Sequence, residues 1–128
     1  MTVTIDVSPG ELIDKITILE IKAERITDPE TRDRVCFELG LLEARRRQAV
    51  PPSPDLEHAA DELRKVNATL WDIEDQLRDC ERACEFGERF VSLARAVYRT
   101  NDRRAALKKR INTLLGSAID EVKAYKPY

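Results

Sequence analysis

The sequence is poor in the residues on which many catalytic and nucleotide-binding folds depend. Among its 128 residues, aromatic side chains make up 5%, and there are four glycines and one histidine. So few aromatic residues and glycines disfavour a β-sandwich, and neither a glycine-rich phosphate loop nor a dinucleotide-binding fingerprint is present. The histidine, His58, is surrounded by acids, which indicates a surface position. Ser-His-Asp and Cys-His active sites therefore have little support.

Long apolar runs and a basic excess are also missing. No apolar stretch approaches the roughly 20 residues that span a bilayer. The first residues, MTVTIDVSPGE, have neither the basic nor the apolar region of a secretory signal. A net charge of −2 disfavours nucleic acid as a partner. We therefore expect a cytoplasmic protein that binds neither nucleic acid nor membrane.

Three cysteines, Cys36, Cys80 and Cys84, form an odd set in a chain for which we expect no export. Free thiols suit such a set better than disulfides do. Cys80 and Cys84 lie on the apolar side of a predicted helix, and buried thiols explain them better than a zinc site does. We expect no metal site and no cofactor.

What the sequence does contain is charge and helical periodicity. Charged residues make up 36% and hydrophobic residues 42%, a balance typical of long helices with solvated outer faces.

One segment does not show helical periodicity: in TVTIDV, Val3, Ile5 and Val7 alternate with polar residues. This alternation predicts a short β-strand over residues 2–7. Its partner would be the C-terminal YKPY stretch or a second subunit.

Helix starts are marked by a capping residue followed by proline, at Ser8, Asp28 and Ser53. Apolar residues recur every three or four positions after each cap, which predicts helices over about 9–26, 29–49, 54–84 and 89–121. The short link between the first two helices makes them a hairpin. The last two, which turn at Gly87, form an antiparallel coiled hairpin roughly 45 Å long. The expected fold is a single all-α domain, an antiparallel four-helix coiled-coil-like bundle with a short N-terminal β-strand.

The first hairpin is too short to cover both ends of the second. An uncovered apolar end favours self-association. We therefore expect a homodimer.

The apolar pattern of the last helix is interrupted in YRTNDRRAALKKRIN, residues 98–112. Thr100 and Arg104 stand where apolar residues are expected, and Asn101, Lys108 and Asn112 lie beside them at helical spacings. Two interpretations remain open. The polar groups fix the helix register or form ion pairs with a neighbouring helix, or they line a polar pocket between helices.

A pocket of this kind would be lined by polar side chains from three of the predicted helices: the first, the third and the fourth. Lys15, Lys22, Arg104 and Lys108 would hold an anionic carboxylate or phosphate, because cationic side chains bind such groups by charge-assisted hydrogen bonds. Asp14 and Glu74 would orient these cations or carry acid–base chemistry, and Asn101 and Asn112 would donate hydrogen bonds. Trp71 lies on the same helix face as Glu74, where packing explains it better than ligand contact does. The predicted ligand-binding residues are Asp14, Lys15, Lys22, Trp71, Glu74, Asn101, Arg104, Lys108 and Asn112.

Three stretches, GELIDKITILEIKAERI, LWDIEDQLRDCE and VYRTNDRRAALKKRIN, resemble an uncharacterised family of small bacterial helical proteins with a domain of unknown function. The resemblance extends from residue 3 to about 125. It implies a supporting role near sugar transfer, because members of that family accompany genes for cell-surface polysaccharides and glycosyltransferases. The matching motif residues are Gly10, Glu11, Asp14, Lys15, Thr17, Glu20, Lys22, Trp71, Asp72, Glu74, Asp75, Asn101, Asp102, Arg104, Lys108 and Asn112.

A looser likeness links LIDKITILEIKAER to the first helix of the all-helical chorismate mutases, which grip a dicarboxylate with cations from several helices. The second helix departs from that pattern. Helical nucleotide pyrophosphatases, which bind magnesium through acidic pairs, are similar only in pairs such as Glu20 with Glu24. The first functional hypothesis is therefore a non-catalytic, oligomeric binding or scaffolding module with a protein partner. The second is an enzyme or binder for an anionic small molecule, with Mg²⁺ conceivable only in this case.

Overall fold

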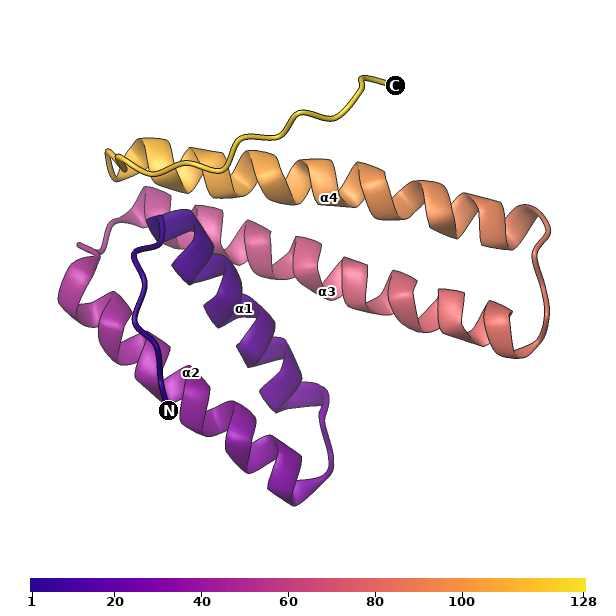
Figure 1. Ribbon diagram of the computed structural model, residues 1–128, viewed down its shortest axis with the longest axis horizontal. Helices are drawn as coiled ribbons and strands as arrows, with labels where there is room; N and C mark the ends of the chain where they lie inside the picture. Colours follow the sequence, from indigo (N-terminus) through magenta and orange to yellow (C-terminus); the bar gives the residue numbers. More distant parts are fainter.

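The computed structural model describes residues 1–128 and contains four α-helices and no β-strand (Figure 1). The predicted helical bundle is confirmed, whereas the predicted N-terminal β-strand is wrong. In chain order the helices are α1 (Pro9–Arg25), α2 (Pro29–Ala49), α3 (Pro54–Arg82) and α4 (Glu88–Leu114).

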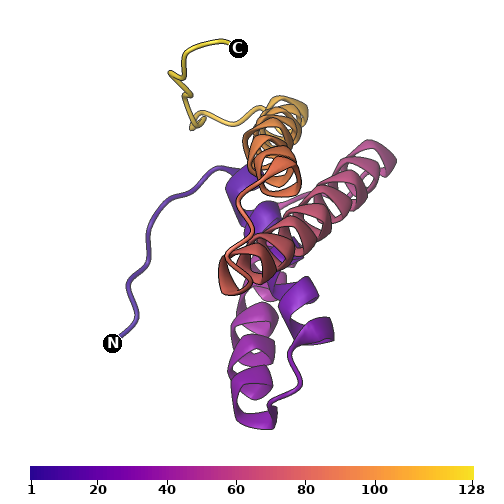
Figure 2. The same cartoon turned by 90° about the vertical axis from the view of Figure 1, so that its right-hand side faces the viewer.

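Residues 2–7 are extended but pair with nothing. Val3 and Ile5 are each 72% exposed, although their alternation is typical of a half-buried strand. A strand needs a second backbone to satisfy its N–H and C=O groups. The other extended stretch of the chain, near the C-terminus, runs along α4, whereas the N-terminal stretch runs away from α4 toward α2 (Figure 1, Figure 2). The prediction failed because alternation records a preference for extended backbone, and this fold offers no partner.

Local capping explains where the first three helices begin. The Ser8 hydroxyl accepts a hydrogen bond from the Glu11 N–H at 3.2 Å, and the Asp28 carboxylate accepts one from the Thr31 N–H at 2.9 Å. Ser53 caps α3 in the same way. Each cap is followed by proline, which has no N–H to leave unsatisfied in the first turn. A cap of this kind contributes about 1 kcal/mol to helix stability.

The end of α4 is set by Gly116, which has a φ of +62°. The Gly116 N–H donates to the Thr113 carbonyl at 3.3 Å, and the Ser117 N–H donates to the Asn112 carbonyl at 2.9 Å. These two bonds form a Schellman motif, which satisfies carbonyls that the helix end would leave free. α4 therefore ends at Leu114 and does not reach the predicted residue 121.

The end of α3 uses the same motif with a less suitable residue. Cys84 takes the left-handed conformation, with a φ of +54°. Its N–H donates to the Glu81 carbonyl, and the Glu85 N–H donates to the Cys80 carbonyl at 2.9 Å. Cys80 is buried as predicted, but Cys84 lies beyond the helix and is exposed, which corrects its expected place on the apolar side.

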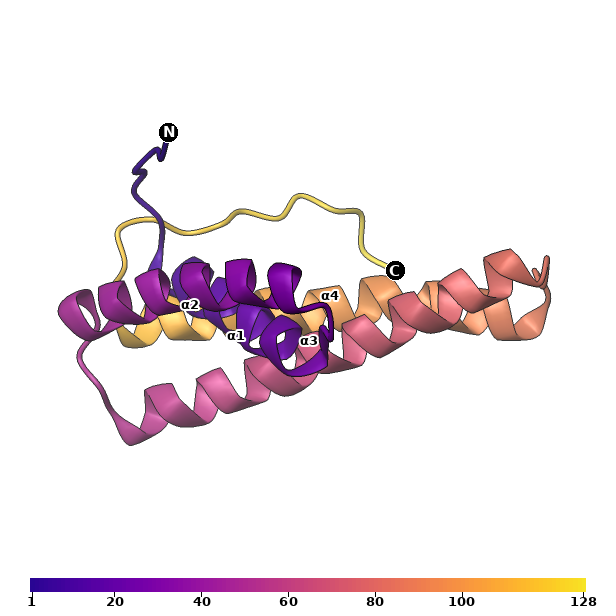
Figure 3. The ribbon, with the colours of Figure 1, turned by 90° about the horizontal axis from the view of Figure 1, so that it is seen from below.

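Two hairpins pack against each other to form the bundle. α3 and α4 form the long antiparallel pair, and α1 packs on both of them. α2 packs on α1 alone among the helices, apart from an ion pair between Arg46 and Glu57 on α3. The shorter hairpin covers one half of the longer one, as Figure 3 shows. The core lies where α1, α3 and α4 meet and is formed by Ile13, Leu56, Ala59, Ala60, Leu63 and Ile111. None of the four helices combines the length and the apolar character needed to cross a bilayer.

Candidate functional site

The first turn of α1 lies directly against the backbone of α4. The Gly10 N–H donates a hydrogen bond to the Asn112 side-chain carbonyl at 2.7 Å. A Cβ atom on Gly10 would overlap the Lys108 carbonyl oxygen and would lie 2.7 Å from Asn112 Oδ1. Glycine is therefore required for the close approach of the two helices. This approach brings the next turn of α1 beside the polar interruption in α4.

Asp14 is the centre of a buried polar cluster between α1, α3 and α4. Its side chain is 1% exposed, and it accepts hydrogen bonds from Arg104 Nε at 2.9 Å and Arg104 Nη2 at 2.5 Å. Asn67 Nδ2 on α3 donates to Asp14 at 2.9 Å and to the Thr17 hydroxyl at 2.9 Å. A buried carboxylate requires such partners, because an unpaired charge is strongly disfavoured in the interior. The Asp14 carboxylate raises the pKa of Arg104 above its ordinary value, although burial opposes the shift.

Lys108, one turn further along α4, lies among three carboxylates. Its Nζ is 2.7 Å from Glu11, 3.1 Å from Glu121 and 4.0 Å from Asp14, and its side chain is 10% exposed. Burial disfavours the charged ammonium and would lower its pKa. Hydrogen bonds to Glu11 and Glu121 more than offset this effect, so the pKa of Lys108 is raised above its ordinary value. The ammonium is therefore held in its charged form.

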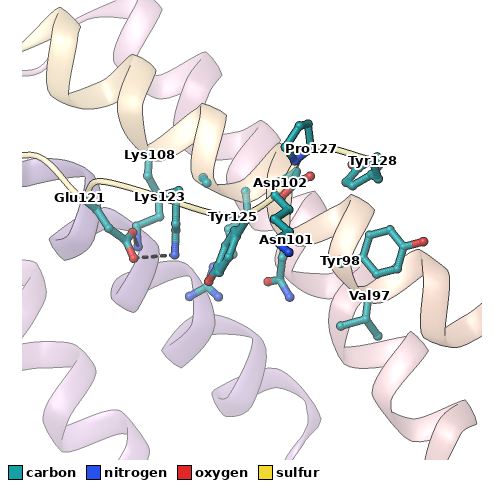
Figure 4. A pocket seen from close by; sticks show the side chains of 13 residues that line it. Val97, Tyr98, Asn101, Asp102, Lys108, Glu121, Lys123, Tyr125, Pro127 and Tyr128 are labelled. Carbon is teal, nitrogen blue, oxygen red and sulfur yellow. Dashed lines mark hydrogen bonds and ion pairs between the residues drawn. The ribbon is translucent and has the colours of Figure 1, made fainter.

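A cavity of about 730 Å³ lies between α4 and residues 121–128, with Arg104 and Lys108 on its wall. Figure 4 shows Lys108, Glu121 and Lys123 at one end of this cavity, and Tyr98 and Tyr128 at the other. The two tyrosine rings have centroids 5.1 Å apart. Four cationic side chains and three tyrosines line it: Arg104, Lys108, Lys123, Lys126, Tyr98, Tyr125 and Tyr128.

A second cavity, of about 350 Å³, lies on another side of Arg104, between α1, α3 and α4. Trp71, Glu74 and Arg104 line it, above an apolar wall that includes Ile18 and Ile21. Beside it, the Arg25 guanidinium lies 5.9 Å from the centre of the Trp71 ring. Arg104 therefore takes part in the buried cluster and in both cavities.

A model of the family DUF6165, described as a family of unknown function, matches residues 3–127. The chain belongs to this family. Of the residues on which the resemblance was read from the sequence, Asp14, Thr17 and Arg104 meet in the buried cluster. Neither the curated proteins nor the solved structures give a match to the chain.

The structure brings most of the predicted site residues of this DUF6165 chain to one region and leaves two aside. Asp14 contacts Arg104 directly, Lys108 lies 4.0 Å from Asp14, and Asn112 anchors the same end of α1. Asn101 lines the larger cavity, and Trp71 and Glu74 line the smaller one. Lys15 instead forms an exposed ion pair with Glu38 on α2 at 3.2 Å. Lys22 lines neither cavity.

Several residues of the site were not predicted. Asn67 was not among the predicted ligand-binding residues, and Glu11 was named only among the residues that carry the family resemblance. Glu121, Lys123 and the tyrosines of the C-terminal segment lay in a stretch that was partly assigned to helix. Gly116 was the available signal, because a glycine beyond a helical pattern marks a helix end. No group of three or more His, Cys, Asp or Glu side chains in the chain is arranged to hold a metal ion.

Proposed function

We propose that this protein is a non-catalytic binding module that holds an anionic small molecule between α4 and the C-terminal segment. The observation that carries the proposal is the cavity of about 730 Å³ with its four cationic side chains and three tyrosines. Ligand sites in proteins usually measure about 300–1,000 Å³, so a small molecule would fit. Cations bind carboxylate or phosphate oxygens, and tyrosine rings pack against apolar or planar parts of a ligand.

The acidic side chains of the cluster are engaged by cationic side chains of the protein, which supports binding over catalysis. Both oxygen atoms of Asp14 accept hydrogen bonds from Arg104, so this carboxylate is not free to take a proton from a substrate. Glu11 and Glu121 are each engaged by Lys108. The cluster acts as a rigid base that holds Lys108 and Arg104 in place along α4.

The setting that we propose is the cytoplasm of a bacterial cell, close to the transfer of sugars to surface polysaccharide. The resemblance described from the sequence supports it, and the absence of a membrane-spanning helix agrees with it. The ligand panel should therefore include nucleotide sugars.

The test is a thermal-shift screen with carboxylates, sugar phosphates, nucleotides and nucleotide sugars, each with and without magnesium. A ligand that binds only the folded state adds about 2.7 kcal/mol of stability at 100 times its dissociation constant. Lys126→Met removes a cation of the cavity and should weaken the response. Lys65→Met on α3 removes an exposed lysine outside it and should not. A panel without any response, at concentrations up to several millimolar, would refute the proposal.

A second function, scaffolding by self-association, is favoured by one observation. α2 buries none of its residues and exposes Phe37 and Leu41, which are 72% and 52% exposed and lie one turn apart. We propose that two copies associate through this face of α2. Light scattering on a sizing column should give a dimer mass for the natural chain and a monomer mass for the Phe37→Ser, Leu41→Ser double variant. A monomer in both cases would reject this second function.

A further inference from the structure

The anion-binding groups of the larger cavity are not equivalent. Arg104 already gives Nε and Nη2 to Asp14, so the planar fork that guanidinium groups offer to carboxylates is in use inside the protein. The cations that remain on the wall are Lys108, Lys123 and Lys126. A lysine ammonium is a compact point charge with three donors and does not offer a fork. The cavity therefore selects for charge density more than for the shape of a carboxylate.

Two of these lysines are already bound to an acid of the chain itself. One oxygen of Glu121 lies 3.1 Å from Lys108 Nζ, and the other lies 2.6 Å from Lys123 Nζ. Figure 4 shows the three side chains side by side at one end of the cavity. The hydrogen bond from Lys123, followed by the one from Lys108, lowers the pKa of the Glu121 carboxyl. Glu121 is thus a negative charge held where a ligand would have to place its own.

The segment that carries Glu121 is held only by side chains. Residues 118–128 are all exposed, and none of them takes part in a backbone–backbone hydrogen bond. Their contacts with α4 include the bond from Asn112 Nδ2 to Asp120 at 2.8 Å and the packing of Tyr128 on Tyr98. The partners that residues 118–128 bring to these contacts are all exposed, and solvated partners contribute little to stability, so the segment can leave without unfolding the bundle.

We propose that the ligand of this cavity carries a phosphate group, and that this phosphate displaces Glu121 from Lys108 and Lys123. The inference rests on the proposed function and names the ligand class. A phosphate monoester carries about −1.5 to −2 charges at pH 7 and three acceptor oxygens, whereas a carboxylate carries one charge and two. A single carboxylate gains nothing by replacing another one. A phosphate gains charge against two ammonium groups, and once Glu121 has left, Glu11 and Asp14 are the acids that remain within 4.0 Å of Lys108 Nζ.

The tyrosines extend this assignment beyond the phosphate. Lys108 and Tyr98 are separated along α4 by about 15 Å, from the rise of roughly 1.5 Å per residue. Tyr98 is 42% exposed, and the ring of Tyr128 packs against its ring. A ligand with a phosphate at one end and a ring at the other would contact both, as a nucleoside diphosphate does.

The experiment compares inorganic phosphate with acetate as probes, by calorimetric titration at an ionic strength held constant with chloride. Three proteins are used: the natural chain, Glu121→Gln, and Glu81→Gln as a control on the exposed face of α3. We expect Glu121→Gln to bind phosphate about fivefold more tightly than the natural chain, because the variant removes the partly solvated ion pairs with Lys108 and Lys123 against which phosphate competes. Glu81→Gln should bind it as the natural chain does, and acetate should remain at least tenfold weaker throughout.

Each alternative outcome has a different meaning. If neither phosphate nor acetate binds any of the three proteins, the phosphate assignment is refuted, and the ligand panel alone decides the proposed function. If phosphate binds the natural chain and Glu121→Gln equally, the displacement of Glu121 is refuted while the binding function stands. If acetate gains as much as phosphate, the phosphate assignment is refuted.

A second measurement does not depend on a variant. Phosphate should accelerate chymotryptic cleavage after Tyr125 in the natural chain, because the displaced segment becomes a better protease substrate. Unchanged cleavage at saturating phosphate would contradict displacement.

Discussion

α1 and α2 begin in the same way, yet they differ in what they bury. Each starts with a capping side chain followed by proline. α1 contributes seven buried residues, among them Asp14 and Thr17, whereas α2 contributes none. An acid on α1 is therefore fixed in the interior, while the same kind of side chain on α2, Glu38, meets Lys15 in water. The comparison shows that burial, and not helix length or charge content, decides which helix builds the polar cluster.

The largest effect should come from removing the buried acid. Asp14→Asn leaves the Arg104 guanidinium without its counterion, and breaking a buried pair by removal of one partner costs about 3–5 kcal/mol. Glu38→Gln on α2 breaks the exposed pair with Lys15, and its cost should stay below about 0.5 kcal/mol. Urea unfolding followed by circular dichroism measures both free energies.

The pairing itself can be separated from the loss of the acid. In a double-mutant cycle of Asp14→Asn with Arg104→Gln, the two losses should not add, because both variants remove the same interaction. Similar losses in Asp14→Asn and Glu38→Gln would mean that the two helices are equivalent and would break the comparison.

The two helical glycines should respond to alanine with opposite signs. Gly10→Ala on α1 forces a methyl group against the Lys108 carbonyl oxygen, a backbone atom that cannot turn aside. Overpacking of this kind costs typically about 1–3 kcal/mol. Gly40→Ala on α2 adds a methyl group with nothing within 4 Å, and alanine in a helix interior is favoured over glycine by up to about 1 kcal/mol. Thermal unfolding of the two variants tests this, and a stabilised Gly10→Ala would show that α1 can move away from α4.

The parts of the fold that could be predicted from sequence are those with local causes. Helix starts at Ser8, Asp28 and Ser53 follow from a side chain that caps its own helix, so no distant residue is needed. The prediction of a β-strand over residues 2–7 was wrong because a strand forms only when it pairs with a second strand, which can lie far along the chain. The predicted end of α4 at residue 121 was wrong. Gly116 indicates a helix end, but apolar residues continue at helical spacing beyond it and extended the predicted helix.

The sequence predicted those parts of the candidate site that follow from the spacing of residues along a helix. The apolar pattern placed Arg104 on the inward side of its helix, and Asp14, which is 90 residues away, was expected only as one of two acids that would orient the cations. Lys15 and Lys22 were grouped with cations that they do not meet. Glu121 and Lys123 lie in an extended segment without any period, so only the structure could bring them to Lys108.

The smallest effect should come from changing Glu20, which lies on α1 near Glu43 of α2. Burial raises the pKa of Glu20, with Arg64 opposing the shift and Glu43 on α2 adding to it. A raised folded pKa means that the carboxyl contributes most to stability below its unfolded value of 4.5, and that this contribution is lost as pH rises through the folded pKa. Glu20→Gln should therefore stabilise the protein at pH 7 by less than about 1 kcal/mol, since the group is partly solvated. The gain should vanish near pH 4, as paired urea unfolding at both pH values will show, and a loss of stability at pH 7 would mean that Glu20 is held chiefly by its arginine neighbours.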